Sequence, residues 1–281
     1  MSRRVVLLAS ALISLPLLLS ACGSSTSATP ATPQAAVESV YHQAVSTASS
    51  YHVVYTVSSS HAGKNDITLT TVGNVYDSPK PTSSYESMTI TATEPGHSNV
   101  GGLLVRVDKG TLFMNADGFK ISGIKKIPGW SSISLNSYRQ DITRGISSAF
   151  TPVVPIHQSK LLGSLLKAGK FVSSGTTTVA GHQVHTYAVT LTTSKFSNAA
   201  YGTEAIDLSR ALELFSVKTP VTFTVDIGSG NRLALVGAAF TGTIFGVSLD
   251  TAITIQYTNY GTTFSVTAPK QAKPVSSLTT L

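Results

Sequence analysis

Alternation of apolar and polar residues dominates the chain from residue 51 onwards. Between Val221 and Ile227, for example, apolar residues occupy the odd positions and polar residues the even ones. Successive strand residues point to opposite faces of a sheet, so such runs predict strands with one buried face. Turn residues such as Asp108-Lys109-Gly110 separate consecutive runs. The pattern predicts about ten or eleven antiparallel strands, the last of them at residues 264–267.

Three stretches depart from this alternation and place apolar residues at helical spacing. The first predicted helix covers residues 34–49, the second stretch combines residues 137–150 with 159–168, and the third covers residues 203–215. The apolar stripes are Ala36, Val37, Val40, Tyr41, Ala44 and Val45, then Leu161, Leu162, Leu165 and Leu166, then Ile206, Leu208, Ala211, Leu212 and Phe215. The fold class expected is therefore α+β, mostly antiparallel β, with a few short helices.

The predicted helices offer little cover for so wide a sheet. An antiparallel sheet must bury its apolar face, so the strands need a second sheet, closure into a barrel, or a curved sheet that encloses the helices and a bound apolar molecule. The residues that we expect to contact such a ligand are Leu161, Leu162, Leu165, Leu166, Leu212, Phe215, Phe223 and Val225. The same leucines could instead fill the core beneath the sheet, and the two roles are compatible.

Residues 1–21 have the pattern of a secretory leader. Arg3 and Arg4 precede an apolar run that contains Pro16 and ends at Leu19, which is too short for a membrane-spanning helix. The run continues as Leu19-Ser20-Ala21-Cys22-Gly23, which resembles the bacterial lipobox, in which the cysteine carries a thioether-linked diacylglycerol. Cys22 is the chain's one cysteine and has no internal disulfide partner. We therefore expect acylated Cys22 to anchor the chain to the extracytoplasmic side of a cell membrane.

Composition supports a tether followed by one strand-rich domain. Residues 22–34 are rich in Ser, Thr and Pro and predict a flexible tether, and residues 35–281 predict a single domain. Charged residues make up 12% of the chain and the formal net charge is +7. The basic residues are scattered and are not interleaved with aromatic residues, so no nucleic-acid partner is expected; attraction to anionic lipid head groups fits the charge better.

The sequence contains none of the common catalytic or nucleotide-binding motifs. Gly-x-Ser-x-Gly, a Walker glycine loop, a dinucleotide fingerprint and His-Glu-x-x-His are all missing. His182 and His185 lie three apart on a predicted strand, where their side chains point to opposite faces and make a poor metal pair. Glu204 and Asp207 fit the start of a helix, where the helix dipole favours acidic groups. We expect a protein that is not an enzyme and binds no metal or cofactor.

A family resemblance rests on the order of these features along the chain. The lipobox, the tether and a helix precede Tyr51-His52-Val53-Val54-Tyr55; later come Ile127-Pro128-Gly129-Trp130, the hairpin of residues 179–187, Tyr257-Thr258-Asn259-Tyr260-Gly261 and Val266-Thr267-Ala268-Pro269. The sequence resembles the actinobacterial lipoprotein group that includes LppX, LprA, LprF and LprG, itself similar in fold to the LolA and LolB carriers. The resemblance implies a curved half-barrel whose concave face, covered by helices, holds acyl chains of lipids or glycolipids in transit across the cell envelope.

Two hypotheses of different classes follow. In the first, the chain is an envelope lipoprotein that binds a lipid or glycolipid and carries it across the envelope. In the second, it is a surface lipoprotein whose sheet edge or exposed face binds an envelope protein. Lipid that copurifies with the domain favours the first hypothesis, and a closed core with a large exposed apolar patch favours the second.

Overall fold

The protein is built on one wide sheet, seen in a computed structural model that describes residues 32–61, 64–78, 85–94, 97–115, 129–143, 157–191, 217, 220–244 and 247–277. The described strands are β1 (Ser49–His61), β2 (Lys64–Asp77), β3 (Tyr85–Glu94), β4 (His97–Asp108), β5 (Thr111–Asn115), β6 (Trp130–Ser134), β7 (Lys170–Val179), β8 (His182–Leu191), β9 (Val221–Gly228), β10 (Arg232–Ile244), β11 (Val247–Thr258) and β12 (Lys273–Pro274). The described helices are α1 (Pro33–Ser46), α2 (Leu135–Thr143) and α3 (Gln158–Ala168).

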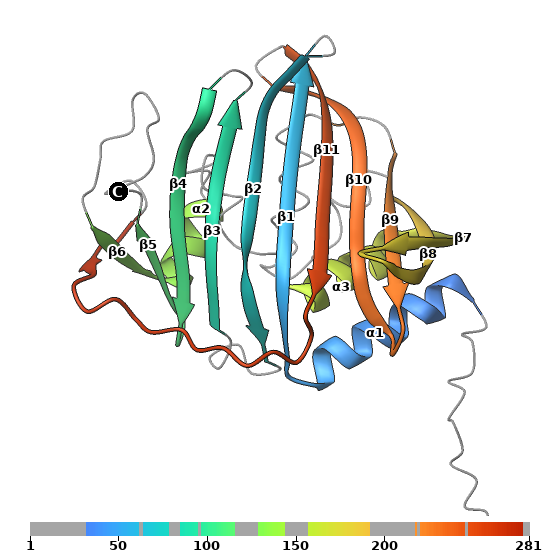
Figure 1. The fold of residues 1–281 in the computed structure, drawn as a ribbon, viewed down its shortest axis with the longest axis horizontal. Helices are drawn as coiled ribbons and strands as arrows, with labels where there is room; N and C mark the ends of the chain where they lie inside the picture. The colour runs from blue at the N-terminus through green and yellow to red at the C-terminus, as the bar shows by residue number, and fades with distance from the viewer. Residues whose placement is uncertain are drawn as a thin grey trace, which may run out of the picture.

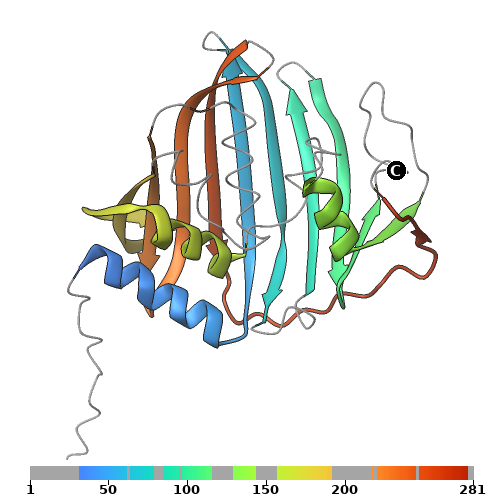
Figure 2. The same ribbon diagram turned by 180° about the vertical axis from the view of Figure 1, so that it is seen from behind.

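All twelve described strands belong to a single open sheet in the order β12-β6-β5-β4-β3-β2-β1-β11-β10-β9-β8-β7 (Figure 1). Every pairing is antiparallel except that of β12 with β6. Strand β1 pairs with β11, so the two halves of the chain meet in the middle of the sheet. The three helices lie on one side of the curved sheet (Figure 2). This arrangement confirms the expected α+β class, with a curved, open, mostly antiparallel sheet and few helices.

The first helix is shorter than the helical spacing of its apolar residues predicted. It begins at Pro33, where the side chain of Thr32 caps it by accepting a hydrogen bond from the backbone N–H of Ala35 at 3.1 Å. It ends at Ser46, three residues before the predicted end, because Ser49 already pairs with Asp77 in the sheet. The first turn of α1 thus overlaps the end of the segment predicted as a tether.

The strand predicted at residues 264–267 is wrong. These residues belong to an irregular segment that crosses the lower ends of the central strands and leads to β12 (Figure 1). One reason is topological, because β1 and β10 already occupy both edges of β11, so the segment that directly follows β11 cannot pair with it. The segment is held instead by side chains such as Arg106, whose Nη1 donates to the Thr267 carbonyl oxygen at 3.0 Å.

The later helix predictions are confirmed in part. Helix α3 matches the stripe predicted at residues 159–168, and α2 begins two residues before the predicted start at residue 137. Residues 144–156 and 203–215 lie outside the described residues, so the rest of the second stretch and the whole third stretch stay predictions.

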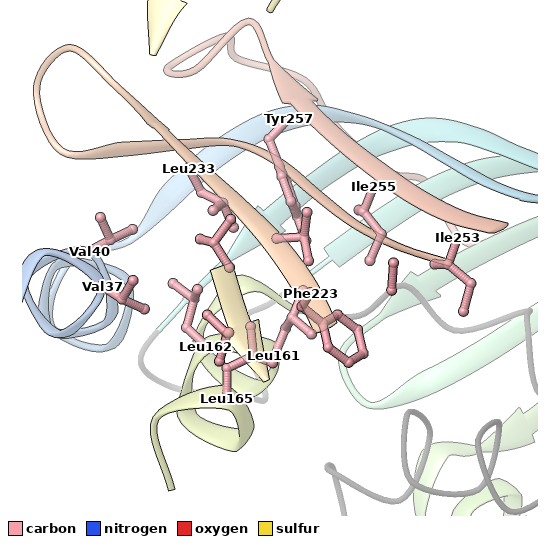
Figure 3. Close-up of a cluster of buried hydrophobic side chains, with 14 of the residues drawn as sticks. Val37, Val40, Leu161, Leu162, Leu165, Phe223, Leu233, Ile253, Ile255 and Tyr257 are labelled. Atoms are coloured by element: carbon pink, nitrogen blue, oxygen red, sulfur yellow. The ribbon is translucent and has the colours of Figure 1, made fainter. Parts of the chain in front are cut away.

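The helix-facing side of the sheet carries two apolar clusters. The larger, which we call the α1/α3 cluster, joins both helices to β1 and to β8–β11 (Figure 3). The smaller, the α2 cluster, joins Tyr138 of α2 to strands β3–β6. One row of directly opposed residues runs through both clusters, and we call it the cross-sheet row. Its members, from β1 to β6, are Tyr51, Val75, Glu86, Val107, Leu112 and Ile133, each at most 4% exposed.

Gly73 of β2 is packed closely against the Met88 side chain on this face of the sheet. It lies opposite Val53 and Met88, and a Cβ atom at this position would overlap the Met88 side chain and the Ser87 carbonyl oxygen. The absence of a side chain at Gly73 is thus what allows Met88 to lie across β2.

Gly73→Ala should lower the free energy of unfolding by about 1–3 kcal/mol, because the added methyl group forces Met88 and the β3 backbone to move. Gly237→Ala is the matched control, since a Cβ there would lie at ordinary distances, 3.5 Å from Leu235 Cδ2 and 3.7 Å from the Ile253 carbonyl oxygen. Urea denaturation of both variants measures the difference. Equal effects of the two substitutions would show that Met88 does not constrain Gly73.

Candidate functional site on the helix-covered face

The helix-facing side of the central strands is a continuous apolar surface. Tyr55 of β1 lies opposite Ile255 of β11, and Val57 lies opposite Ile253. Further rows continue these pairs on both sides, through Ala238 and Phe223 in one direction and through Thr71, Ile90 and Leu103 in the other. Apolar side chains therefore extend from β9 to β4 with few polar interruptions.

The residues predicted to contact a ligand lie in the α1/α3 cluster wherever the structure describes them. Leu161, Leu162 and Leu165 of α3 are at most 2% exposed and face Val37 and Val40 of α1 and the sheet (Figure 3). Leu166 is half-buried at the edge of the same cluster, and Phe223 and Val225 of β9 are buried within it. Leu212 and Phe215 lie outside the described residues. These leucines are core residues of the protein; their contact with a ligand stays a prediction.

The C-terminal end of α3 is packed closely against the sheet. Gly169 follows α3 directly, and its backbone N–H donates to the Leu165 carbonyl oxygen at 2.8 Å. A Cβ atom at Gly169 would overlap Val189 of β8, so a side chain here would push the helix end away from the sheet. The next residue, Lys170, already begins β7. This end of the helix is therefore fixed by packing and by the chain itself.

A buried ionic cluster lies at the other end of α3. His157 precedes the helix, its Nε2 lies 3.1 Å from Glu86 Oε1, and its Nδ1 lies 3.2 Å from Asp77 Oδ1. Asp77 and Glu86 stand on β2 and β3, and their side chains are 11% and 2% exposed. Each ring nitrogen faces a carboxylate oxygen, so both must carry a proton for the contacts to be favourable. The geometry thus calls for a charged imidazolium between two carboxylates.

Electrostatics agree with this protonation state. Burial alone would lower the pKa of His157, but the contacts with the Asp77 and Glu86 carboxylates outweigh it and raise the pKa from 6.5 to about 9. Burial also raises the pKa of the neighbouring Tyr51 well above its ordinary value, with a further contribution from Asp77. Within the described residues, the Tyr51 hydroxyl, Glu86 Oε2 and His157 Nδ1 are buried without a hydrogen bond of good geometry, so the approach of His157 Nδ1 to Asp77 is an ionic contact. The cluster therefore combines one positive and two negative groups in a largely buried environment.

A second polar contact secures the start of α3. Gln158 Nε2 donates to the Tyr260 hydroxyl at 2.6 Å, and this hydroxyl donates to the Leu233 carbonyl oxygen at 2.5 Å. The Arg232 guanidinium lies 5.1 Å from the centre of the Tyr260 ring. The N-terminal end of α3 is thus held by polar side chains from β2, β3 and the turn after β11.

The sequence analysis missed the ionic cluster. Asp77, Glu86 and His157 are far apart in the chain, and no motif links them. The sequence did contain one indication of the cluster. Glu86 lies on the same face of its strand as the buried Met88 and Ile90, where alternation predicts an inward apolar residue. A charged residue in that register indicates a buried partner.

The two histidines considered as a metal pair lie on β8, and both are exposed. Among the described residues, no group of three His, Cys, Asp or Glu side chains is placed to hold a metal ion. In the same part of the chain, no helix combines the length and the apolar character needed to cross a membrane.

Removal of His157 should destabilise the protein and abolish a pH dependence. His157→Gln leaves two buried carboxylates without a counter-charge, so the free energy of unfolding near neutral pH should fall by about 3–5 kcal/mol. The folded state holds the His157 proton more tightly than the unfolded state does. This stabilisation is complete below pH 6.5 and is lost as the pH rises through about 9.

Urea denaturation between these pH values tests the expectation. The wild type should lose about 3 kcal/mol across the window, and His157→Gln should lose much less. His185→Gln, which changes an exposed histidine on β8, is the control and should follow the wild type. Parallel curves for the wild type and His157→Gln would mean that the imidazolium contacts do not stabilise the fold.

Comparison with known proteins places this geometry beside several solved structures. The chain matches no protein-family model and no curated protein. It is similar to LprF from Mycobacterium bovis (12% identity, TM-score 0.49, covering 84% of this chain and 96% of LprF) and to the Mycobacterium tuberculosis lipoprotein LppX (15% identity, TM-score 0.44, 83% and 97%). The LolA superfamily protein NE2245 from Nitrosomonas europaea aligns with 9% identity and a TM-score of 0.23, over 80% of this chain and 92% of its own.

LprF and LppX are both named in the lipoprotein group that the sequence resembles, and NE2245 carries the LolA name. At identities and TM-scores this low, the likeness carries no inference about ligand or activity. The proposals that follow therefore rest on the residues of this chain.

Proposed function

We propose that the chain is an envelope lipoprotein, anchored through acylated Cys22, that binds the acyl part of a lipid or glycolipid against the helix-facing side of its sheet. The observation that carries the proposal is the continuous apolar surface that runs from β9 to β4. A surface of this kind suits an elongated apolar molecule better than a small polar one.

The position of the helices supports the same reading. Helices α1 and α3 pack on each other and join strands β1 and β8–β11 in the α1/α3 cluster, while α2 contacts β5 and β6. The described helices cross only part of the length of these strands, and β1, β2, β10 and β11 continue beyond them (Figure 2). Among the middle strands, β1 carries Tyr55 and Val57, which are only half-buried. We place the acyl chain on these middle strands, as part of the apolar cover that the described helices do not supply.

The energies are of the right size for such a ligand. Each methylene group removed from water contributes about 0.8 kcal/mol, so about ten buried methylenes contribute about 8 kcal/mol before the cost of association. Contacts of this kind select chain length and not head-group chemistry. The proposal therefore names acyl chains as the class of ligand, and transport of that ligand is the role that an anchored protein with such a site would serve.

Lipid should copurify with residues 23–281 expressed without leader or Cys22 and isolated without detergent; this length retains the Thr32 cap of α1. Native mass spectrometry is expected to show stoichiometric lipid. Val57→Glu should reduce the lipid-bound fraction, because Val57 is half-buried on β1, one of the strands on which we place the acyl chain. The fully buried Leu162 is a poor choice, since a polar group there would unfold the domain.

Val172→Glu is the matched control, because Val172 on β7 is 54% exposed and should tolerate the charge without loss of lipid. Circular dichroism confirms that both variants are folded. Protein that carries no lipid from any of several expression hosts would refute the binding proposal and would favour the protein-interaction hypothesis.

The anchor has its own test. Expressed with its leader in a bacterial host, the full chain should fractionate with membranes, and mass spectrometry of the mature N-terminal peptide should show diacylglycerol on Cys22. Cys22→Ser should release the protein into the soluble fraction with the domain intact. A mature N-terminus at another residue, or membrane association that Cys22→Ser does not change, would contradict the lipobox interpretation.

A further inference from the structure

We propose that Asp77, His157 and Glu86 form a latch that holds the N-terminal end of α3 on the sheet, and that α3 pivots about its C-terminal end at Gly169 when the latch opens. The latch itself is a property of the ligand-free protein. Its role in admitting an acyl chain rests on the function proposed above.

The two ends of α3 are held in different ways. At the C-terminal end, Gly169 packs so closely on Val189 that no side chain fits, and the chain enters β7 one residue later. At the N-terminal end, His157 and Gln158 make polar contacts with β2, β3 and the turn after β11, and the apolar contacts begin at Leu161. In the proposed motion this polar end is released, with Gly169 as the hinge.

The chemistry of the latch suits a contact that must break and re-form. Buried ion pairs lose hydration when they form, so their net contribution to stability is smaller than their mutual attraction. When α3 lifts, the His157 imidazolium and both carboxylates regain water, which offsets part of the lost contact. The helix dipole adds to this balance, because a positive charge is disfavoured at a helix N-terminus and His157 needs the two carboxylates to remain there.

The position of the latch links it to the apolar surface. Glu86 stands in the cross-sheet row between Val75, which belongs to the α1/α3 cluster, and Val107, which belongs to the α2 cluster. His157 therefore covers the place where the two clusters adjoin. Release of the N-terminal end of α3 would uncover this junction and the leucines of α3 together.

Several other groups face the latch and enter its pH dependence. Tyr51 of β1 interacts with both Asp77 and Glu86, and Tyr257 of β11 interacts with Asp77. Tyr260 lies beyond them, with Arg232 against its ring. Burial raises the pKa of all three tyrosines above its ordinary value of 10, so His157 is the member of this group that titrates between pH 7 and 9.5.

Amide hydrogen exchange of ligand-free residues 23–281 tests the latch directly. His157→Gln and Glu86→Gln should each accelerate exchange at residues 160–163 by about tenfold or more and leave residues 165–168 much less affected. In the wild type, exchange at residues 160–163, corrected for its chemical rate, should increase as the pH rises from 7 to 9.5. His157→Gln should show no such increase, and His185→Gln should behave as the wild type.

The wild-type pH series needs no substitution and keeps the test decisive if a variant fails to fold. Equal acceleration at both ends of α3, or wild-type exchange that does not change with pH, would overturn the latch. The role of the latch in ligand entry is tested by the rate at which the protein takes up pyrene-labelled phosphatidylglycerol from phosphatidylcholine vesicles. Glu86→Gln should increase this rate severalfold.

The two proposals can fail separately. Faster amide exchange at residues 160–163 than at residues 165–168, without any lipid uptake, would support the latch and refute lipid binding. The other outcome combines the same difference in exchange between the two ends of α3 with lipid uptake that Glu86→Gln does not change. It would support the latch and lipid binding but refute the role of the latch in ligand entry.

Discussion

The apolar face of the open sheet is the surface on which the other described elements depend. Twelve strands in one layer leave two free ends, β7 and β12, and the sheet does not close on itself to bury that face. The three described helices, of 14, 9 and 11 residues, lie against it and cover only part of it. Close packing therefore decides where each helix sits: Gly163 of α3 approaches Tyr41 of α1 so closely that a Cβ atom would lie 3.1 Å from its ring.

Polar contacts decide how α3 is oriented on this apolar surface, because apolar packing alone tolerates sliding and rotation. Leucines at successive turns can meet a sheet in several registers, but His157 reaches Asp77 and Glu86 in one position only. The carboxylates cost free energy in the unpaired state and so penalise other positions of the helix. The cluster thus gives specificity to a helix whose stability comes from its leucines.

The sequence predicted the strands and helices well and the ionic cluster not at all. Alternation is a local signal, so it identified β9, but it also predicted a strand at residues 264–267 because it holds no information on which sheet edges are free. The leucines of α3 were found by their spacing. Asp77 and Glu86 become neighbours through the register of β2 with β3, and His157 reaches them through the position of α3, and both are tertiary properties.

The segment predicted as a tether leads into the α1/α3 cluster. Helix α1 begins at Pro33, at the end of that segment, and packs on α3, the helix that bears the leucines (Figure 1). Asn231 in the turn after β9 donates to Ser39 of α1 at 3.0 Å, so α1 is also fixed to the sheet. About ten extended residues between Cys22 and α1 reach at most about 35 Å. With the proposed anchor at Cys22, the start of α1 would stay within that distance of the bilayer, which keeps the α1/α3 cluster near the membrane from which an acyl chain would come.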